Sequence, residues 1–180
     1  TTFRPFTIED YHKMAEAGVF APDERIELIG GQLYPMSPAG HKHTTIIMQL
    51  TRVLMNHFGN EYDIGIQTPV TLDDESEPEP DAAVVRRYRK GEAPHKPTSS
   101  DVFLLIEVSD TTFVFDRDVK LPRYASATIP EVWLIDVDRD TITQYHTPRN
   151  GVYTRSAVYQ HGDIILTTLG VEISADDILL

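Results

Sequence analysis

The chain has 180 residues and no Cys, with 16 Lys or Arg against 28 Asp or Glu, for a formal net charge of −12. This length predicts a single domain over residues 1–180 that buries about 70% of its unfolded surface, and the lack of cysteine excludes a disulfide scaffold or a thiolate metal site. Apolar runs of five residues or fewer exclude a membrane-spanning helix, so we expect a soluble cytoplasmic protein. The acidic net charge disfavours a nucleic-acid partner, unless a local basic patch or a bound cation reverses the sign of the charge at the binding site.

The first predicted elements are a short helix and a hairpin. Thr7 can cap a helix that runs to Ala17, with acidic side chains in its first turn and Gly18 after its end. The runs RIELI and QLYPM, joined by Gly30-Gly31, are typical of a two-stranded hairpin. Charged side chains interrupt the first ten residues, which therefore lack the apolar segment of a secretory signal.

A long amphipathic helix is predicted from Gly40 to Phe58, with Gly59 ending it. Its apolar residues recur at alternating steps of four and three, which is the period of a helix with one buried face. The stripe expected to face the core consists of His43, Ile47, Leu50, Leu54 and His57.

After this helix the pattern changes to that of strands. In order we expect YDIGIQTPVTL as one or two strands, the loop DDESEPEPD, the strand DAAVVRR and a loop over residues 88–101. VFLLIEV is continuously apolar and predicts a buried central strand. A helix from about Asp116 to Ala127 separates it from EVWLIDV, and this strand–helix–strand order predicts a parallel pair with a right-handed crossover.

The remaining segments predict the outer part of the sheet. TITQYH follows the turn DRD and predicts an antiparallel strand. Residues 152–159 and 164–167 predict edge strands, and SADDILL a terminal helical turn. The expected fold class is α+β, a mixed sheet of about six or more strands with helices packed on it.

Two carboxylates on predicted strands are candidate metal ligands. Asp81 follows a proline and opens one strand, and Glu107 lies near the end of the most apolar strand. Two such charges on neighbouring strands repel by about 4 kcal/mol at about 4 Å and an effective dielectric of about 20. A divalent cation between them would remove that cost, and oxygen ligands suit Mg²⁺ or Mn²⁺. The alternative is that Glu107 caps the strand or pairs with an arginine, and spacing alone leaves both interpretations open.

Lys120 is a candidate catalytic residue on the helix that follows Glu107. Asp116, Lys120 and Tyr124 share one helix face at steps of four. The lysine could point at the sheet end and stabilise charge developing on a phosphate. The alternative is a solvent-exposed Asp116–Lys120 pair, which spacing alone favours. Pro122 fits this helix if hydrogen bonding begins near Asp118 or Val119, which places the proline in the first turn.

Three further features are candidates for supporting roles. Residues 73–79 form an acidic loop that is expected to be solvated, because it lacks the ligand spacing of a calcium-binding loop. His43, near the start of the long helix, could bind a phosphate, orient a carboxylate or lie in the core. The main basic cluster is Arg86, Arg87, Arg89 and Lys90 around Tyr88, and it either contacts phosphates near Asp81 or is a solubilising loop.

Four segments together resemble a known family. In chain order they are RIELIGGQL, MSPAGHKH, EPEPDAAVV and LLIEVSDTTFVFDRDVKLPRYASATIPEVWLID. Their order and spacing resemble the Uma-type endonucleases, a bacterial branch of the PD-(D/E)xK restriction-endonuclease-like superfamily, over about Thr7 to Asp140. The resemblance implies a restriction-endonuclease-like fold and a nuclease core that depends on Mg²⁺ or Mn²⁺.

The resemblance also implies roles for individual residues. Pro80-Asp81 matches the PD element and Glu107 the acidic residue of the second motif, so both would hold the metal. Ser109 stands where the superfamily usually has its lysine, and Lys120 is implied to substitute for that lysine. Glu27 matches an acidic position that assists metal binding, and His43, Asp116 and Tyr124 match recurring family positions.

The implied activity is hydrolysis of phosphodiester bonds in a nucleic-acid partner, expected to be DNA, by a homodimer. Lys120 would position or deprotonate the attacking water and stabilise the developing charge.

Two other functions stay open. The first is a catalytically silent nuclease fold that acts as a nucleic-acid-binding or protein-binding regulatory dimer, which the acidic charge and the small basic cluster favour. The second is another carboxylate hydrolase, such as a glycosidase, which needs two acids about 5–10 Å apart and no metal.

Overall fold

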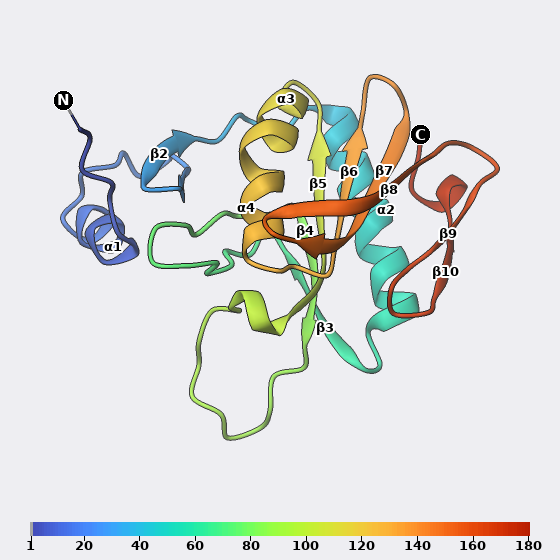
Figure 1. Cartoon of the computed structure of the whole chain (residues 1–180), viewed down its shortest axis with the longest axis horizontal. Helices are drawn as coiled ribbons and strands as arrows, with labels where there is room; N and C mark the ends of the chain where they lie inside the picture. The colour runs from blue at the N-terminus through green and yellow to red at the C-terminus, as the bar shows by residue number, and fades with distance from the viewer. Residues whose placement is uncertain (1) are drawn as a thin grey trace.

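The strand predicted to be central, β5 (Val102–Ser109), lies inside a six-stranded sheet, in a computed structural model that describes residues 2–180. In spatial order the sheet contains β3 (Tyr62–Ile66), β4 (Ala82–Arg86), β5, β6 (Glu131–Asp136), β7 (Thr141–Arg149) and β8 (Val152–Tyr159) (Figure 1). β5 and β6 are parallel and the other neighbours are antiparallel. The predicted α+β class and mixed sheet are therefore confirmed.

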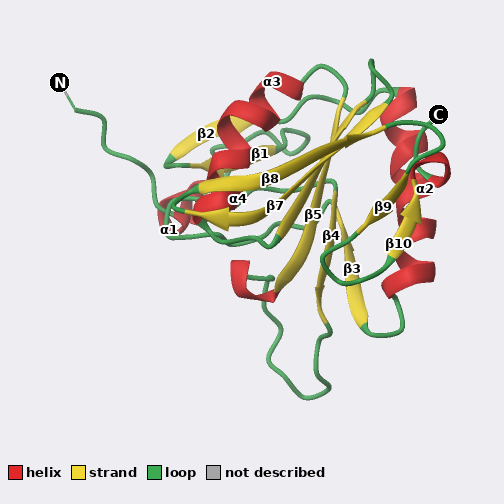
Figure 2. Cartoon of the chain, turned by 45° about the vertical axis from the view of Figure 1, so that its right-hand side comes forward, coloured by secondary structure: helices red, strands yellow, loops and turns green. Residues whose placement is uncertain are grey.

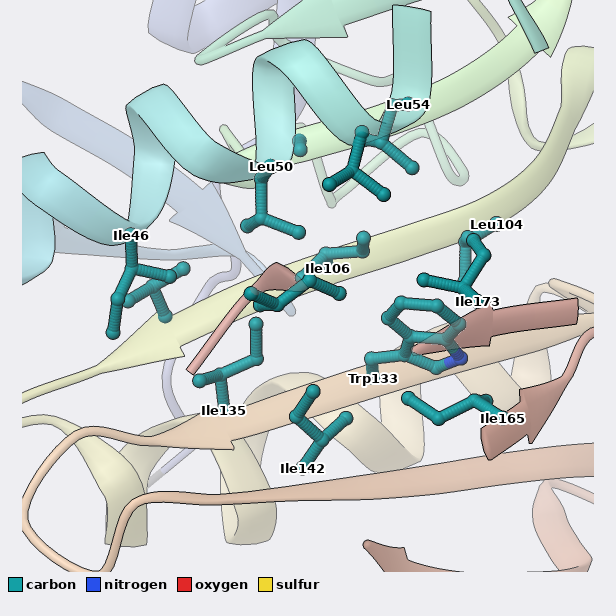
Figure 3. Close-up of a cluster of buried hydrophobic side chains, with 14 of the residues drawn as sticks. Ile46, Leu50, Leu54, Leu104, Ile106, Trp133, Ile135, Ile142, Ile165 and Ile173 are labelled. Atoms are coloured by element: carbon teal, nitrogen blue, oxygen red, sulfur yellow. The ribbon is translucent and has the colours of Figure 1, made fainter. Parts of the chain in front are cut away.

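The two faces of the sheet are covered by different helices. α2 (His41–Phe58) packs on one face, where Ile106 and Trp133 meet its buried side chains (Figure 3). α4 (Leu121–Ser126) packs on the other face, where Leu105 and Leu134 meet Tyr124. Because side chains alternate along a strand, Glu107 shares the α4 face with Leu105.

The buried stripe of α2 differs from the predicted one. Leu50 and Leu54 are buried as expected, but His57 is exposed and Ile47 is only partly buried. The residues that fill the core are Ile46, Leu50, Val53, Leu54 and Phe58. The helix is therefore rotated slightly about its axis relative to the predicted stripe, and His43 lies at the margin of its buried face.

The first helix and the hairpin form as predicted. α1 (Ile8–Glu16) has a capping box in which Thr7 and Asp10 exchange hydrogen bonds. β1 (Ile26–Ile29) and β2 (Gln32–Pro35) pair antiparallel, and Gly30 and Gly31 between them both have positive φ. A two-residue turn with both φ values positive matches the strand twist, and glycine adopts it without strain.

The helical segment after β5 is irregular. It begins at α3 (Phe113–Phe115), continues as a π-helical turn η2 (Asp116–Lys120) and ends as α4, whereas one helix was predicted from about Asp116. The N–H of Leu121 donates a hydrogen bond to the carbonyl of Asp116, five residues earlier in the chain. The break in α-helical bonding places Pro122 in the first turn of α4, where its missing N–H costs little.

The C-terminal segment covers the α2 side of the core. β9 (Ile164–Leu166) and β10 (Glu172–Ser174) form a separate hairpin, and the short helix η3 (Ala175–Asp177) follows (Figure 2). Ile165 and Ile173 project from this hairpin toward Trp133 (Figure 3). The edge strand and the terminal helical turn were predicted, whereas β10 was not.

The acidic loop over residues 73–79 is only partly solvated, so the prediction for it is wrong in part. Asp73 and Asp74 are exposed, but Glu77 is buried and contacts His12 and Lys96. Burial raises the pKa of Glu77, but its hydrogen bonds with His12 and Lys96 lower the pKa by more than burial raises it. The pKa of Glu77 is therefore below its usual value. This carboxylate therefore joins α1 to the loop after β4.

That loop ends in the short helix η1 (Ser99–Asp101), which leads into β5. None of the helices in residues 2–180 is long and apolar enough to cross a membrane.

Candidate active site

A pocket of about 180 Å³ lies at the end of the sheet where β5 stops. Its wall is assembled from β1, the segment that joins β2 to α2, the start of α2, Gln67 after β3, the residues before β4, the end of β5 with the turn that follows it, and the π-helical turn. The titratable side chains that line it are Arg25, Glu27, His43, Glu79, Asp81, Glu107, Asp110, Asp116 and Lys120. The structure thus brings the predicted Asp81, Glu107, Lys120 and Glu27 to one place.

Asp81 and Glu107 are neighbours across the sheet. Ala82 pairs with Ile106 in the antiparallel β4–β5 register, so Asp81 stands opposite Glu107 by continuation of the ladder. The N–H of Val108 donates to Asp81 Oδ2 at 2.8 Å, and His43 Nε2 lies 3.0 Å from Asp81 Oδ1. That bond to Asp81 raises the pKa of His43, against the opposing effect of partial burial.

Lys120 is buried among carboxylates and not exposed on the helix surface. Its Nζ lies 3.0 Å from Glu27 Oε2, 3.2 Å from Glu107 Oε1 and 3.9 Å from Asp116 Oδ1. Only 4% of Lys120 is exposed. Burial alone lowers the pKa of Lys120, but the surrounding carboxylates more than offset this and hold it well above its usual value, so the side chain stays an ammonium.

Tyr124, one turn beyond Lys120, also contacts Glu107. Its hydroxyl donates to Glu107 Oε1 at 2.5 Å, so the lysine and the tyrosine hold the same carboxylate oxygen. Burial raises the pKa of Glu107 well above its usual value, against the attraction of Lys120. Burial and the nearby Glu107 likewise raise the pKa of Tyr124, which therefore remains a hydrogen-bond donor.

Asp116 is held by two hydroxyl groups that the sequence reasoning did not identify. Ser109 Oγ and Thr112 Oγ1 each donate to Asp116 Oδ2 at 2.7 Å. Ser109 lies two residues after Glu107 and therefore on the same face of β5, which is the signal that could have indicated its role. The residue at the usual lysine position thus supports the helix that carries Lys120.

Glu27 is buried on β1 and contacts the site through Lys120. Its Oε2 accepts the ammonium and also the N–H of Glu79 at 3.2 Å. Burial raises the pKa of Glu27, while Lys120 opposes that shift.

Arg86 and Arg87 lie away from the pocket, so of the two interpretations left open for the basic cluster, contact with phosphates near Asp81 does not fit the structure. They lie at the opposite end of β4, about 20 Å from Asp81 for six residues of extended chain. Arg86 is paired with Glu92 and Asp101.

The donor set of the pocket fits a hard divalent cation. Glu27, Glu107 and Asp116 surround the Lys120 ammonium. Asp81 is paired with His43, and Arg25 also lines the pocket, so its buried carboxyl groups outnumber its Lys and Arg cations. No group of three or more Asp, Glu or His side chains within residues 2–180 is arranged to hold a metal by itself. Mg²⁺ is commonly bound by one or two carboxylates with water and substrate phosphate, so a site without three protein ligands is compatible with it, and Asp81 and Glu107 are the residues that would hold the ion.

Comparisons with known proteins agree with the fold and with the resemblance. Residues 8–176 match the model of the Uma2 family, described as "Putative restriction endonuclease". A crystal structure of "a putative nuclease belonging to DUF820" from Anabaena variabilis ATCC 29413 has 17% sequence identity and a TM-score of 0.72, and the match covers 97% of each chain. At that identity the likeness shows a shared fold. A search of curated proteins found no match.

Proposed function

We propose that this chain, which belongs to the Uma2 family, is a divalent-metal-dependent endonuclease that hydrolyses phosphodiester bonds in DNA. Membership of the family and the fold shared with a nuclease support a nuclease-like function. The observation that carries the finer proposal is the convergence of Asp81, Glu107 and the Lys120 ammonium in one pocket.

Asp81 and Glu107 would hold Mg²⁺ or Mn²⁺. A bound ion of this kind would lower the pKa of a water molecule and neutralise charge on the scissile phosphate. The protein supports this arrangement by fixing both carboxylates. Val108 N–H and His43 orient Asp81, and Tyr124 holds one oxygen of Glu107.

Lys120 acts by its positive charge. Because its pKa is raised well above the usual value, it is a poor proton acceptor, so we assign to it the stabilisation of negative charge on the phosphate and not the deprotonation of water. Glu27 contacts the ammonium directly, and we assign to it the positioning of Lys120 instead of metal binding.

The proposal includes a homodimer, because one pocket of this kind cuts one strand, and cleavage of both strands of a duplex requires two copies of the chain.

The second candidate function is a catalytically silent nuclease fold that binds nucleic acid or protein. The net charge of −12 and the lack of a three-ligand metal cluster within residues 2–180 favour it.

The test is cleavage of supercoiled plasmid and of single-stranded DNA with and without Mg²⁺ or Mn²⁺. We expect metal-dependent cleavage by the wild type, and losses of at least about 100-fold in Asp81→Asn and Lys120→Met. Asp74→Asn is the matched control, because it makes the same change at an exposed carboxylate and should cleave like the wild type.

Cleavage that does not need metal, or that survives in Asp81→Asn at the rate of Asp74→Asn, would contradict the proposal. No cleavage by any of the proteins would favour the silent module.

A further inference from the structure

A second concave surface lies at the opposite end of the sheet from the candidate active site. This groove has a volume of about 510 Å³ and is lined by Glu61, Tyr62, Arg86, Arg87, Tyr88, Arg89, Lys90 and Phe103. We refer to it as the Tyr88 groove. The loop between β4 and η1, which carries Tyr88, projects from one end of the sheet, and α3 lies at the other end (Figures 1 and 2). The length of β4 separates the groove from Asp81.

The groove gathers positive charge on an otherwise acidic chain. Four of the 16 Lys and Arg residues line it, against one acidic residue, Glu61. Arg86 is paired with Glu92 and Asp101, but the exposed side chains of Arg89 and Lys90 form no ion pair within residues 2–180. Arg87 is half exposed and only loosely paired, at 3.7 Å from Asp63. Arg87 also donates to the carbonyl of Gly59 at 2.5 Å. Arg89 and Lys90 are therefore the cations most available to a polyanion.

Three aromatic side chains line the same groove as these cations. Tyr62 and Phe103 are partly buried and pack edge to face at 5.0 Å. Tyr88 is 43% exposed. Aromatic faces beside exposed Lys and Arg form the combination that stacks unpaired bases while the cations contact phosphates. A phosphate-only ligand would not need the rings, and a folded duplex would not offer its bases to them.

We propose that the Tyr88 groove binds a single-stranded segment of nucleic acid, as a contact surface separate from the candidate active site. The identity of the ligand rests on the proposed nuclease function, whereas the surface itself rests on the geometry and charge of this loop. The distance of about 20 Å along β4 corresponds to about six nucleotides of a stacked strand. The groove would hold a strand that flanks the cleaved bond by that length.

The test is binding of a fluorescent single strand of about 20 nucleotides, measured by anisotropy in the absence of divalent metal so that cleavage does not interfere. Arg89→Glu/Lys90→Glu should weaken binding by about tenfold and reduce the slope of log K against log salt by about 1.4, at about 0.7 per phosphate contact. Both side chains are exposed, so the melting temperature should not change.

The matched control is Arg149→Glu/Arg155→Glu on β7 and β8. It makes the same change in net charge at exposed arginines that form no ion pair within the described part of the chain. We expect it to weaken binding by less than about twofold. Equal losses in the two double variants would overturn the proposal, because the effect would then come from net charge alone. A loss confined to a duplex of the same sequence would also overturn it.

A second pair of variants tests the ring. Tyr88→Ala should weaken binding by about fivefold or more, whereas Tyr88→Phe keeps the ring and should bind like the wild type. Binding that is unchanged in Tyr88→Ala would overturn the stacking role of this groove.

Failure of this inference can be distinguished from failure of the proposed nuclease function. Metal-dependent hydrolysis of bis(p-nitrophenyl) phosphate, which is too small to span both sites, should be unchanged in Arg89→Glu/Lys90→Glu. If the wild type hydrolyses this substrate and DNA but the groove variants bind normally, the groove proposal alone is overturned. If the wild type neither binds nor hydrolyses, both are overturned.

Discussion

At the scale of residues, the side chain of Glu107 is where burial and negative charge act together in the candidate site. It is 2% exposed, and Asp116, Asp81 and Glu27 nearby add to the effect of burial in raising its pKa. Two donors offset this cost, the Lys120 ammonium and the Tyr124 hydroxyl, and both contact Oε1. A carboxylate held in this way is fixed in orientation before any ligand arrives.

Replacement of Tyr124 by Phe measures this support. The variant removes the hydroxyl at the bond to Glu107 and keeps the ring, so we expect the free energy of unfolding to fall by about 1.5–3 kcal/mol, as for hydrogen bonds to charged groups. Urea denaturation monitored by circular dichroism gives the value. Tyr153→Phe is the control, because its hydroxyl donates to a neutral carbonyl, that of Ile129, at 2.9 Å, and should cost about 0.5–1.5 kcal/mol. A smaller cost for Tyr124→Phe than for Tyr153→Phe would show that Glu107 does not depend on this donor.

The sequence indicated the residues of the candidate active site better than it indicated the position of the arginines in the basic cluster. Spacing alone left a metal-binding and a structural role open for Asp81 and Glu107 and favoured a solvent-exposed Lys120, and it was the family resemblance that assigned all three to one site. Contact of Arg86 and Arg87 with phosphates near Asp81 was one of two open interpretations, suggested by closeness in sequence, but an extended strand separates its two ends by its whole length. Burial of Glu77 was not predictable, since His12, one of its partners, is 65 residues away in the chain.

At the scale of elements, the π-helical turn η2 explains how Pro122 and Lys120 coexist. A proline within a regular α-helix removes a hydrogen bond and clashes with the carbonyl four residues back, at a cost of about 3 kcal/mol. Here the turn Asp116–Lys120 precedes it, and α4 begins at Leu121, so the proline lies where no α-helical partner is required. The same turn leaves Lys120 and Tyr124 both in contact with Glu107.

Pro122→Ala tests whether the proline is accommodated or strained. We expect the free energy of unfolding to fall by about 0.4–1 kcal/mol, because alanine makes the unfolded chain more flexible and no strain is relieved. Denaturant unfolding measures the change. A gain of more than about 1 kcal/mol would mean instead that the proline strains the helix and that the π-helical turn is its consequence.

The elements themselves were predicted well where one face is buried and less well elsewhere. In α2, Leu50 and Leu54 belong both to the predicted stripe and to the observed one. The apolar stripe of such a helix is more than about 100° wide, so two different sets of residues that share some members can both fit it. Whether Ile46 or Ile47 is buried then depends on how the helix packs on the sheet, and the sequence of the helix alone does not specify this packing. β9 and β10 both have three residues, but β9 is apolar throughout, whereas β10 has a single apolar residue, Ile173, and gives no recognisable pattern.

At the scale of the whole molecule, the sheet holds two surfaces of opposite charge at its two ends. The acidic pocket lies where β5 stops, and the basic, aromatic Tyr88 groove lies where β4 stops. Because β4 and β5 are antiparallel neighbours, the register that brings Asp81 opposite Glu107 also sets the distance between the two surfaces. A net charge of −12 therefore does not exclude a nucleic-acid partner, since four of the 16 Lys and Arg residues line one groove.

Addition of divalent metal to the whole protein separates the two candidate functions. A metal that binds only the folded state raises the free energy of unfolding by about 2.7 kcal/mol at 100 times its Kd, which raises the melting temperature by about 5–10 °C for a chain of this size. We expect this rise for the wild type and for Asp74→Asn in Mg²⁺ or Mn²⁺, and little or none for Asp81→Asn, because in the proposed site Asp81 is one of the two carboxylates that would hold the ion. Differential scanning fluorimetry with and without EDTA measures it. An equal rise in Asp81→Asn would place the metal elsewhere, and no rise in the wild type would favour the catalytically silent fold, because a pocket that holds no metal cannot perform the proposed hydrolysis.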